Sequence, residues 1–137
     1  MNTKITAASV RAIQYNADAA TKTFYDGLKE RRFRGTKCTA CGHVPFPPRE
    51  FCVKCHCQKI EWIDLPTKGT VHAFSYQQRS WRFSKPDVLG LVSLEGVNGL
   101  VLTKLAGKID ELSIGQTVQL DFVEVGPELV VHQFKPI

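Results

Sequence analysis

The stretch Cys38-Thr-Ala-Cys-Gly-His-Val-Pro-Phe-Pro-Pro-Arg-Glu-Phe-Cys-Val-Lys-Cys, residues 38–55, decides the fold of the first half of this 137-residue chain. It holds two C-x-x-C pairs. Each pair can bring two thiolates to one ion, and four thiolates in a tetrahedron are a ligand set that suits Zn²⁺. We therefore predict one structural zinc ion bound by Cys38, Cys41, Cys52 and Cys55. Iron is the chemical alternative for the same four sulfurs.

The residues around the two pairs fit a module that a metal ion stabilises. Pro45, Pro47 and Pro48 exclude a helix between the pairs, and the gap leaves room for a short β-hairpin. The segment cannot build a hydrophobic core alone, and modules this small need a metal or disulfides. Three nearby residues are predicted to stay outside the metal site, namely the free thiol of Cys57 and the polar neighbours His43 and His56.

Ahead of the cysteines the sequence predicts a helix. Thr21 or Thr23 can cap its start, and apolar residues then recur on one helical face up to Phe33. We expect residues 1–35 to form a helical arm and residues 36–66 to form the metal module.

From Gly69 onward the apolar residues take the period of β-strands. Five runs are predicted strands: Val71–Gln77, Val88–Leu94, Leu100–Leu105, Thr117–Glu124 and Leu129–Phe134. A Val-Asn-Gly turn within residues 96–99 predicts a hairpin between the second and third runs, and residues 109–115 are predicted to form a short helical turn or loop. Residues 67–137 therefore favour a five-stranded barrel of the OB type, with an SH3-like barrel as the alternative.

Composition limits the class of protein. Hydrophobic residues make up 43% and charged residues 23%, the balance of a folded chain. No apolar run approaches the roughly 20 residues of a membrane span, and the first ten residues lack the apolar core of a signal peptide. We expect a cytoplasmic protein with reduced thiols and no membrane contact.

A net charge of +5 favours anionic partners but does not choose among them. Five cations crowd one short stretch: Lys29, Arg31, Arg32, Arg34 and Lys37. One interpretation is a solvated helix end, where cations suit the helix dipole, and the other is contact with an anion.

No catalytic constellation is apparent. The histidines are scattered along the chain, and no serine or cysteine lies in a recognisable nucleophile context. We expect His72 and His132, which fall in strand runs, to be surface or barrel-lining residues rather than catalytic bases. The chain is therefore predicted not to be catalytic alone.

Nucleic-acid binding is the alternative function, because the chain is basic and OB barrels often serve it. In the predicted loop of residues 78–86, Arg79, Trp81 and Arg82 could stack on bases and contact phosphates. The second and third strand runs, however, carry no aromatic residue. Strands with aliphatic side chains on both faces favour packing against a protein instead.

An ordered set of motifs resembles a known family. In chain order they are Phe24-Tyr-Asp-Gly-Leu, Cys38-Thr-Ala-Cys-Gly, Phe46-Pro-Pro-Arg, Cys52-Val-Lys-Cys, Glu61-Trp62, Gly69-Thr-Val and Ile114-Gly-Gln-Thr-Val. From about residue 22 onward the set is similar to the zinc-ribbon plus OB-fold proteins called domain of unknown function 35. The chain departs from the family pattern at His56, where many members have glycine, and at Cys57.

The resemblance implies a mainly β protein with an N-terminal helical arm, a rubredoxin-like zinc ribbon and a C-terminal five-stranded OB-fold barrel. It also implies a non-catalytic accessory subunit that associates with a thiolase-like enzyme, stabilises it and borders its coenzyme A site. Six residues are candidates for contact with that partner or with a coenzyme A thioester: Arg34, Phe46, Arg49, Arg79, Trp81 and Arg82.

Overall fold

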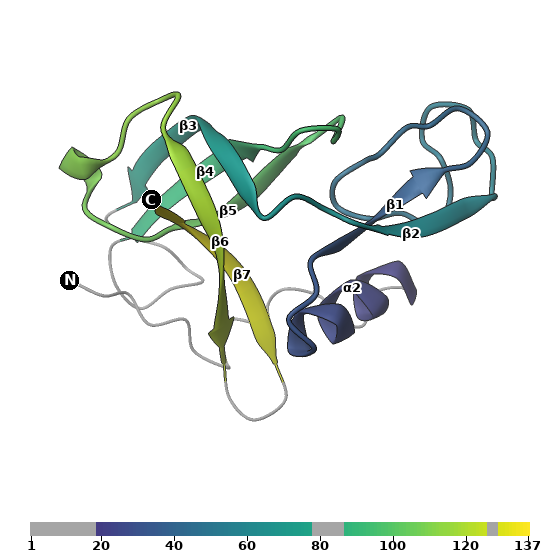
Figure 1. The fold of residues 1–137 in the computed structure, drawn as a ribbon, viewed down its shortest axis with the longest axis horizontal. Helices are drawn as coiled ribbons and strands as arrows, with labels where there is room; N and C mark the ends of the chain where they lie inside the picture. The colour runs from purple at the N-terminus through teal and green to yellow at the C-terminus, as the bar shows by residue number, and fades with distance from the viewer. Residues whose placement is uncertain (1–18, 78–86, 126–128) are drawn as a thin grey trace.

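The computed structural model describes residues 19–77, 87–125 and 129–137. In chain order the elements are α2 (Ala19–Lys29), β1 (Arg34–Cys38), β2 (Ile60–Asp64), β3 (Lys68–Gln77), β4 (Asp87–Ser93), β5 (Leu100–Leu105), the 3-10 helix η1 (Ile109–Glu111), β6 (Thr117–Glu124) and β7 (Val130–Pro136). Figure 1 shows a barrel on one side and the smaller β1–β2 ribbon on the other, with α2 beside both β7 and β1. The fold is mainly β, as predicted.

Helix α2 buries Phe24 and Leu28 and ends earlier than the sequence suggests. Arg31 adopts a left-handed backbone conformation with φ of 61°. Its N–H donates to the Leu28 carbonyl at 3.0 Å, and the next N–H donates to the Gly27 carbonyl at 2.8 Å. This pair of bonds is a Schellman motif, which stops the helix before it reaches Phe33. Within the described ranges, no helix combines the length and hydrophobicity that a membrane crossing requires.

Strands β1 and β2 pair antiparallel, from Arg34 opposite Asp64 to Cys38 opposite Ile60. The two strands flank the cysteine loops rather than lying between them. The short hairpin expected between the C-x-x-C pairs is wrong, because residues 42–51 form no strand. Three prolines in that segment have no N–H to donate to a strand ladder.

The barrel is closed in the order β3-β4-β5-β7-β6, with β6 returning to β3. All neighbouring pairs are antiparallel except β5 and β7, which run parallel. This order is that of an OB-fold and excludes the SH3-like alternative. The five predicted strands, the β4–β5 hairpin and the helical turn at η1 are confirmed, and Gly96 in the hairpin turn has a positive φ of 79°.

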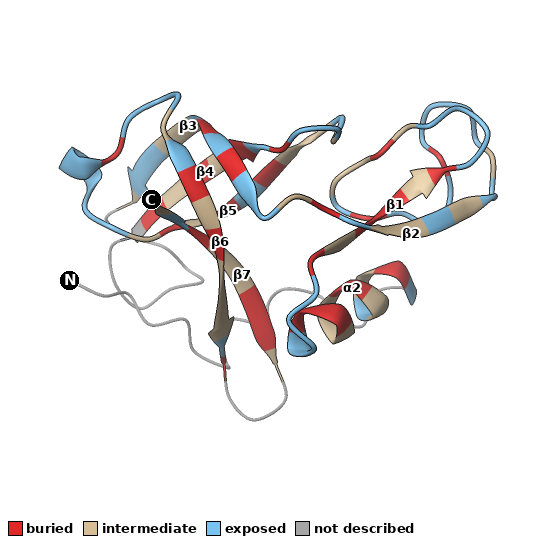
Figure 2. Ribbon diagram, viewed as in Figure 1, coloured by how far each residue is buried: buried red, intermediate tan, exposed pale blue. Residues whose placement is uncertain are grey.

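The main hydrophobic core fills the barrel and continues under α2, as the buried positions in Figure 2 indicate, and a small second cluster gathers around Val125 and Val131. Inward-facing side chains supply it on alternate residues of each strand, among them Val71, Val92, Val101, Val118 and Phe134.

Contacts with α2 and with the barrel help to hold the ribbon in place. Phe46 of the ribbon packs against Phe24 of α2, with ring centroids 5.6 Å apart. The β4–β5 turn also reaches the ribbon: the Asn98 N–H donates to the Val44 carbonyl at 2.8 Å, and the Val44 N–H donates to Asn98 Oδ1 at 2.9 Å. These contacts fix the position of the cysteine loops relative to the barrel.

Candidate metal centre

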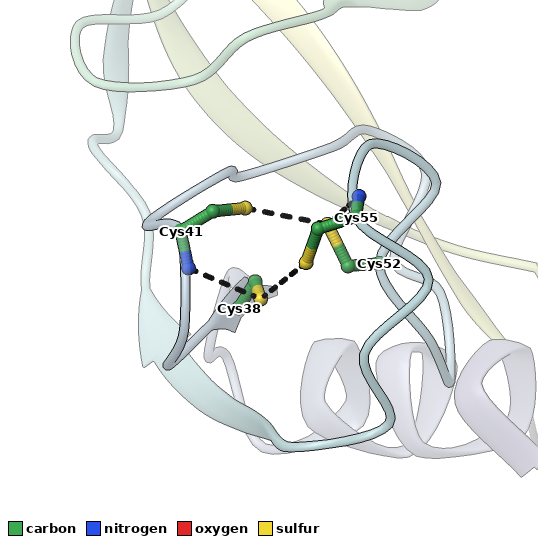
Figure 3. A group of neighbouring side chains, drawn as sticks. All are labelled: Cys38, Cys41, Cys52 and Cys55. Carbon is green, nitrogen blue, oxygen red and sulfur yellow. Dashed lines mark hydrogen bonds between the residues drawn. The ribbon is translucent and has the colours of Figure 1, made fainter.

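The four predicted ligand sulfurs lie together at one end of the ribbon (Figure 3), all within 4.8 Å of one another. The Sγ atoms of Cys38 and Cys55 are 3.6 Å apart, and those of Cys41 and Cys52 are 3.5 Å apart. A tetrahedral ion with metal–sulfur bonds of about 2.3 Å requires sulfur–sulfur distances of about 3.8 Å. The donor set and its spacing therefore fit zinc.

The first loop turns sharply after Cys41. The Cys41 N–H donates to Cys38 Sγ at 3.5 Å, and the Gly42 N–H donates to the Cys38 carbonyl at 2.9 Å. The Cys38 N–H in turn donates to the His43 carbonyl at 3.0 Å. Gly42 takes a positive φ of 79°, a conformation that glycine adopts without strain.

The second loop repeats this pattern bond for bond. The Cys55 N–H donates to Cys52 Sγ at 3.4 Å, and the His56 N–H donates to the Cys52 carbonyl at 2.9 Å. The Cys52 N–H closes the ring on the Cys57 carbonyl at 2.8 Å. His56 takes the left-handed position, with φ of 63°. The two loops are therefore equivalent knuckles on opposite sides of the metal site.

The thiols of the cluster differ in acidity. The backbone N–H of Cys41 is the main cause that lowers the pKa of Cys38 to about 6. The Cys57 backbone N–H acts to lower the pKa of Cys55, but the Cys38 thiol, desolvation and the Cys52 and Cys41 thiols together raise it to about 12. Four thiolates in this space repel one another, and a dication at their centre removes that repulsion.

Four protein ligands leave no open position for water or substrate, so the site is suited to a structural ion. Cys57 is half-buried outside the four-sulfur group, and its Sγ accepts a bond from the Lys59 N–H at 3.3 Å. His43 and His56 also lie outside that group.

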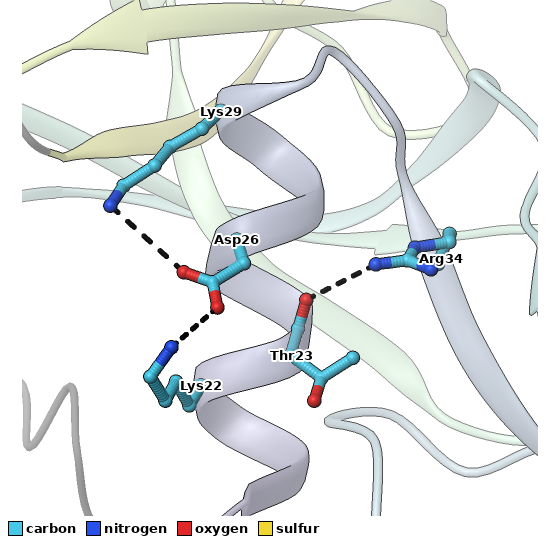
Figure 4. A network of polar contacts seen from close by, with 5 residues as sticks. All are labelled: Lys22, Thr23, Asp26, Lys29 and Arg34. Carbon is cyan, nitrogen blue, oxygen red and sulfur yellow. Dashed lines mark hydrogen bonds and ion pairs between the residues drawn. The ribbon is translucent and has the colours of Figure 1, made fainter.

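Arg34, a predicted contact residue, begins β1, and its side chain lies between α2 and Trp62 of β2. Its Nη2 donates to the Thr23 carbonyl at 3.4 Å (Figure 4), and its guanidinium lies 5.6 Å from the centre of the Trp62 ring. Gly27 leaves room for this arrangement, because a Cβ there would be 3.0 Å from Arg34 Nε. The side chain is half-buried.

The other predicted contact residues are not gathered in one place. Phe46 is half-buried in the aromatic packing at the junction, whereas Arg49 is exposed and anchors its loop by donating its N–H to Thr36 Oγ1 at 3.1 Å. Three residues of the proposed contact loop fall outside the described residues: Arg79, Trp81 and Arg82.

The basic stretch after α2 is largely matched by acids of the same chain. Arg31 Nη2 lies 2.7 Å from Glu124 Oε1, and Arg32 Nη2 lies 3.2 Å from Asp64 Oδ1. Lys29 Nζ is 3.9 Å from Asp26, which also pairs with Lys22 at 2.7 Å (Figure 4). These pairs favour a structural explanation for the stretch over contact with an anion.

Two exposed apolar residues in the ribbon have no counterpart among the sequence predictions. Phe51 and Val53 flank Cys52 and remain 46% and 45% exposed. The sequence contained a signal for this exposure, because a module this small has no hydrophobic core on which apolar residues beside a metal ligand could pack.

Known family models match both the ribbon and the barrel of this chain. A family model described as ChsH2, rubredoxin-like zinc ribbon domain, matches residues 26–61. A second, described as ChsH2, C-terminal OB-fold domain, matches residues 62–123.

The chain is also similar to individual proteins. It is 31% identical over 117 residues to a "Probable enoyl-CoA hydratase alpha subunit" of Thermomonospora curvata, a match that covers 82% of this chain and 36% of that protein. The chain thus spans about a third of that relative. It is 31% identical over 121 residues to a "DUF35 domain-containing scaffold protein" of Methanocaldococcus jannaschii, covering 80% of this chain and 86% of the relative.

Two solved structures share the fold. One, titled "Ltp2-ChsH2(DUF35) aldolase", superposes with a TM-score of 0.77 at 27% identity and covers 88% of this chain and 97% of that one. The other, a DUF35 protein of unknown function from Sulfolobus solfataricus, has a TM-score of 0.68 at 20% identity and covers 95% of each chain.

Proposed function

The chain belongs to the DUF35 family of zinc-ribbon and OB-fold proteins, and on that premise we propose that it is a non-catalytic accessory subunit of an enzyme complex acting on acyl-CoA. Relatives named as scaffold proteins, and a DUF35 chain in a structure titled as an aldolase, support the accessory or scaffold role. The relative named as an enoyl-CoA hydratase subunit supports an acyl-CoA substrate for the complex.

The observation that carries the proposal is the outer face of β4 and β5. Leu91 and Leu102 stand opposite each other in the strand register, and Ala73 of β3 continues the row. Leu102 is 64% exposed between inward-facing neighbours. Three strands thus carry a row of apolar side chains on the outside of the barrel. Because the interior of the barrel is already filled, this outer row favours contact with a protein partner.

Strand β6 provides the contrast. Its buried residues Val118 and Leu120 alternate with the polar residues Gln119 and Asp121, as expected for a barrel wall that faces water. An apolar pair also occurs on β6 and β7, where Val123 stands opposite Val131, but that pair packs in a small cluster with Tyr25 of α2. In the described part of the barrel, the exposed apolar row therefore lies on β3–β5. OB-folds that bind nucleic acid present aromatic side chains at this face, and β4 and β5 have none.

In this proposal the partner is thiolase-like and holds the chemistry, while this chain stabilises it and borders the coenzyme A thioester. The zinc ion fixes the ribbon and takes no part in the reaction. Residues expected to contact the partner or coenzyme A are Arg34, Phe46, Arg49, Arg79, Trp81 and Arg82.

The test begins by purifying the tagged chain from its native host and identifying the enzyme subunit that accompanies it by mass spectrometry. That subunit is then produced alone and with this chain, and the activity and the size of the complex are measured. We expect a stable hetero-oligomer and activity that depends on this chain. An enzyme that is fully active alone and forms no complex in size-exclusion chromatography would contradict the proposal.

A pair of variants tests the surface. Leu102→Glu places a charge in the apolar row and should weaken association at least about tenfold. Gln119→Glu places the same charge on the polar β6 wall and should leave association unchanged. Equal zinc content and equal melting temperatures would establish that both variants are folded.

A further inference from the structure

The two zinc knuckles have the same backbone conformation but expose different side chains. Exposed positions of the first are small and uncharged, namely Thr39, Ala40 and Gly42. The second exposes Phe51 and Val53, which are 46% and 45% accessible. Equivalent turns around one metal site do not require this difference, so the side chains of the second knuckle need another explanation.

The second knuckle is also positively charged. Residues 49–59 contain three exposed cations, Arg49, Lys54 and Lys59, against one exposed acid, Glu50. The ion pairs found among the described residues involve none of these cations. Four cations in or just after α2, in contrast, are matched by acids of the same chain, namely Lys22, Lys29, Arg31 and Arg32. The charge on the second knuckle is therefore available to another molecule.

The surface is held rigidly. The ring of bonds from Cys52 to the Cys57 carbonyl and from His56 back to Cys52 fixes the turn, and Thr36 Oγ1 holds the backbone at Arg49. The hydrogen bonds found for residues 49–59 all stay within the ribbon, which lies at the end of the molecule away from the barrel in Figure 1. A surface fixed in advance loses little entropy when it binds.

We propose that the second knuckle, residues 49–59, docks on the enzyme subunit at an apolar patch rimmed by acidic residues. The inference rests on the proposed function and adds a second surface for contact with the enzyme subunit, besides the apolar row on β3–β5. Phe51 and Val53 would fill the apolar centre, and Arg49 and Lys54 would face the carboxylates. Phenylalanine and arginine are both enriched in protein interfaces, and charge complementarity speeds the encounter.

The positive charge of the second knuckle favours an acidic enzyme subunit over a second copy of this chain as the binding partner. Two copies meeting at this surface would bring like charges together, and the chain as a whole carries +5. Nucleic acid and anionic lipid would also match the charge, but the relatives named as scaffold proteins favour a protein partner. Both are outcomes of the test.

The experiment uses the full zinc-loaded chain and the purified enzyme subunit identified by the native purification. Dissociation constants and association rates are measured at about 50 and 300 mM salt, a range over which screening of exposed charges changes strongly. Phe51→Ala should weaken binding about tenfold, mainly through faster dissociation. Lys54→Glu should weaken it about tenfold through slower association, and should reduce its salt dependence.

The control is Ala40→Glu, which puts the same charge on the first knuckle and should bind as the unaltered chain does. Zinc content and melting temperature establish that each variant keeps its fold. Binding of the unaltered chain that Phe51→Ala and Lys54→Glu leave unchanged would overturn the docking surface while the proposed function stands. No binding by the unaltered chain would overturn the proposed function itself.

Two further probes separate the other occupants. Single-stranded DNA and vesicles containing phosphatidylserine are titrated with the same variants at about 150 mM salt. We expect weak binding to both, without dependence on Phe51. Sub-micromolar binding to either probe that is lost in Phe51→Ala, with enzyme binding retained, would overturn the inference.

Discussion

The Nδ1 atom of His132 on β7 lies 2.9 Å from the hydroxyl oxygen of Thr103 on β5, and three phenylalanine rings pack around the same imidazole. Phe24 comes from α2, Phe33 from the segment before β1 and Phe46 from the ribbon. Their centroids lie 5.9, 6.0 and 6.2 Å from that of the imidazole. His132 is thus the point at which helix, ribbon and barrel meet.

Stability should fall on acidification because of this residue. Burial lowers the pKa of His132 from 6.5 to about 4. Between these values the unfolded chain binds a proton that the folded chain does not, so folding loses free energy as the pH falls from about 6.5 to 4 and is unaffected by this group above 6.5. The loss reaches up to about 3 kcal/mol, since one pKa unit corresponds to about 1.4 kcal/mol.

Urea unfolding at several pH values measures this effect. His132→Gln has no titrating ring, so its stability should change less between pH 7 and pH 4.5 than that of the unaltered chain. Both proteins lose zinc affinity in acid, and the difference between them isolates His132. Parallel pH profiles would contradict the assignment.

Asn98→Ala should weaken the attachment of the ribbon to the barrel. It leaves the N–H of the buried Val44 without its side-chain acceptor, a loss of about 1–3 kcal/mol. Asn98→Asp keeps an acceptor oxygen and should lose less. Hydrogen exchange at the Val44 amide reports the attachment directly, and an unchanged exchange rate in Asn98→Ala would contradict it.

The purified chain should hold about one zinc ion, because the four sulfurs form one closed site. Cys38→Ser and Cys52→Ser each remove a ligand and should lose the ion and the fold of the ribbon, since metal binding supplies folding free energy. Elemental analysis and circular dichroism measure both. Cys57→Ser is the control and should keep its zinc. A folded ribbon with neither zinc nor iron would contradict the site.

Substitutions at the equivalent positions 42 and 56 of the two knuckles should change stability in opposite directions. His56→Gly relieves a non-glycine residue at φ of 63° and should stabilise the zinc-loaded chain by roughly 0.5 kcal/mol, after allowance for the flexibility that glycine adds to the unfolded state. Gly42→Ala introduces the same strain and should destabilise by about 1 kcal/mol, although a Cβ there would meet nothing within 4 Å. Thermal melts of both variants provide the comparison. Equal shifts in one direction would mean that φ is not the cause.

Features coded by local spacing could be predicted from the sequence. The two C-x-x-C pairs, the alternation along each strand and the turn at Asn98 each lie within a few residues, and the structure contains the cysteine cluster, the barrel strands and the hairpin.

Features that depend on distant partners could not be predicted. The end of α2 could not be located because the left-handed residue there is Arg31 and not glycine. Tertiary contacts hold Arg31 in this conformation, since its guanidinium lies over Phe122 and pairs with Glu124. The same pairing explains why a run of cations that suggested an anion site is largely matched within the chain. Val44 and Asn98 are 54 residues apart, and nothing in either segment indicates the other.

The packing of α2 against β7 has a consequence for synthesis of the protein. Phe24 is translated before His132, which packs against it and follows only after the ribbon and four barrel strands have been made. Until residues 130–136 leave the ribosome, the barrel cannot close and the side of the helix that packs against β7 stays uncovered, although the ribbon can already contact Phe24. The nascent chain therefore carries an incompletely covered apolar helix from the synthesis of α2 until that of β7, and it is during that interval that we expect it to need a chaperone.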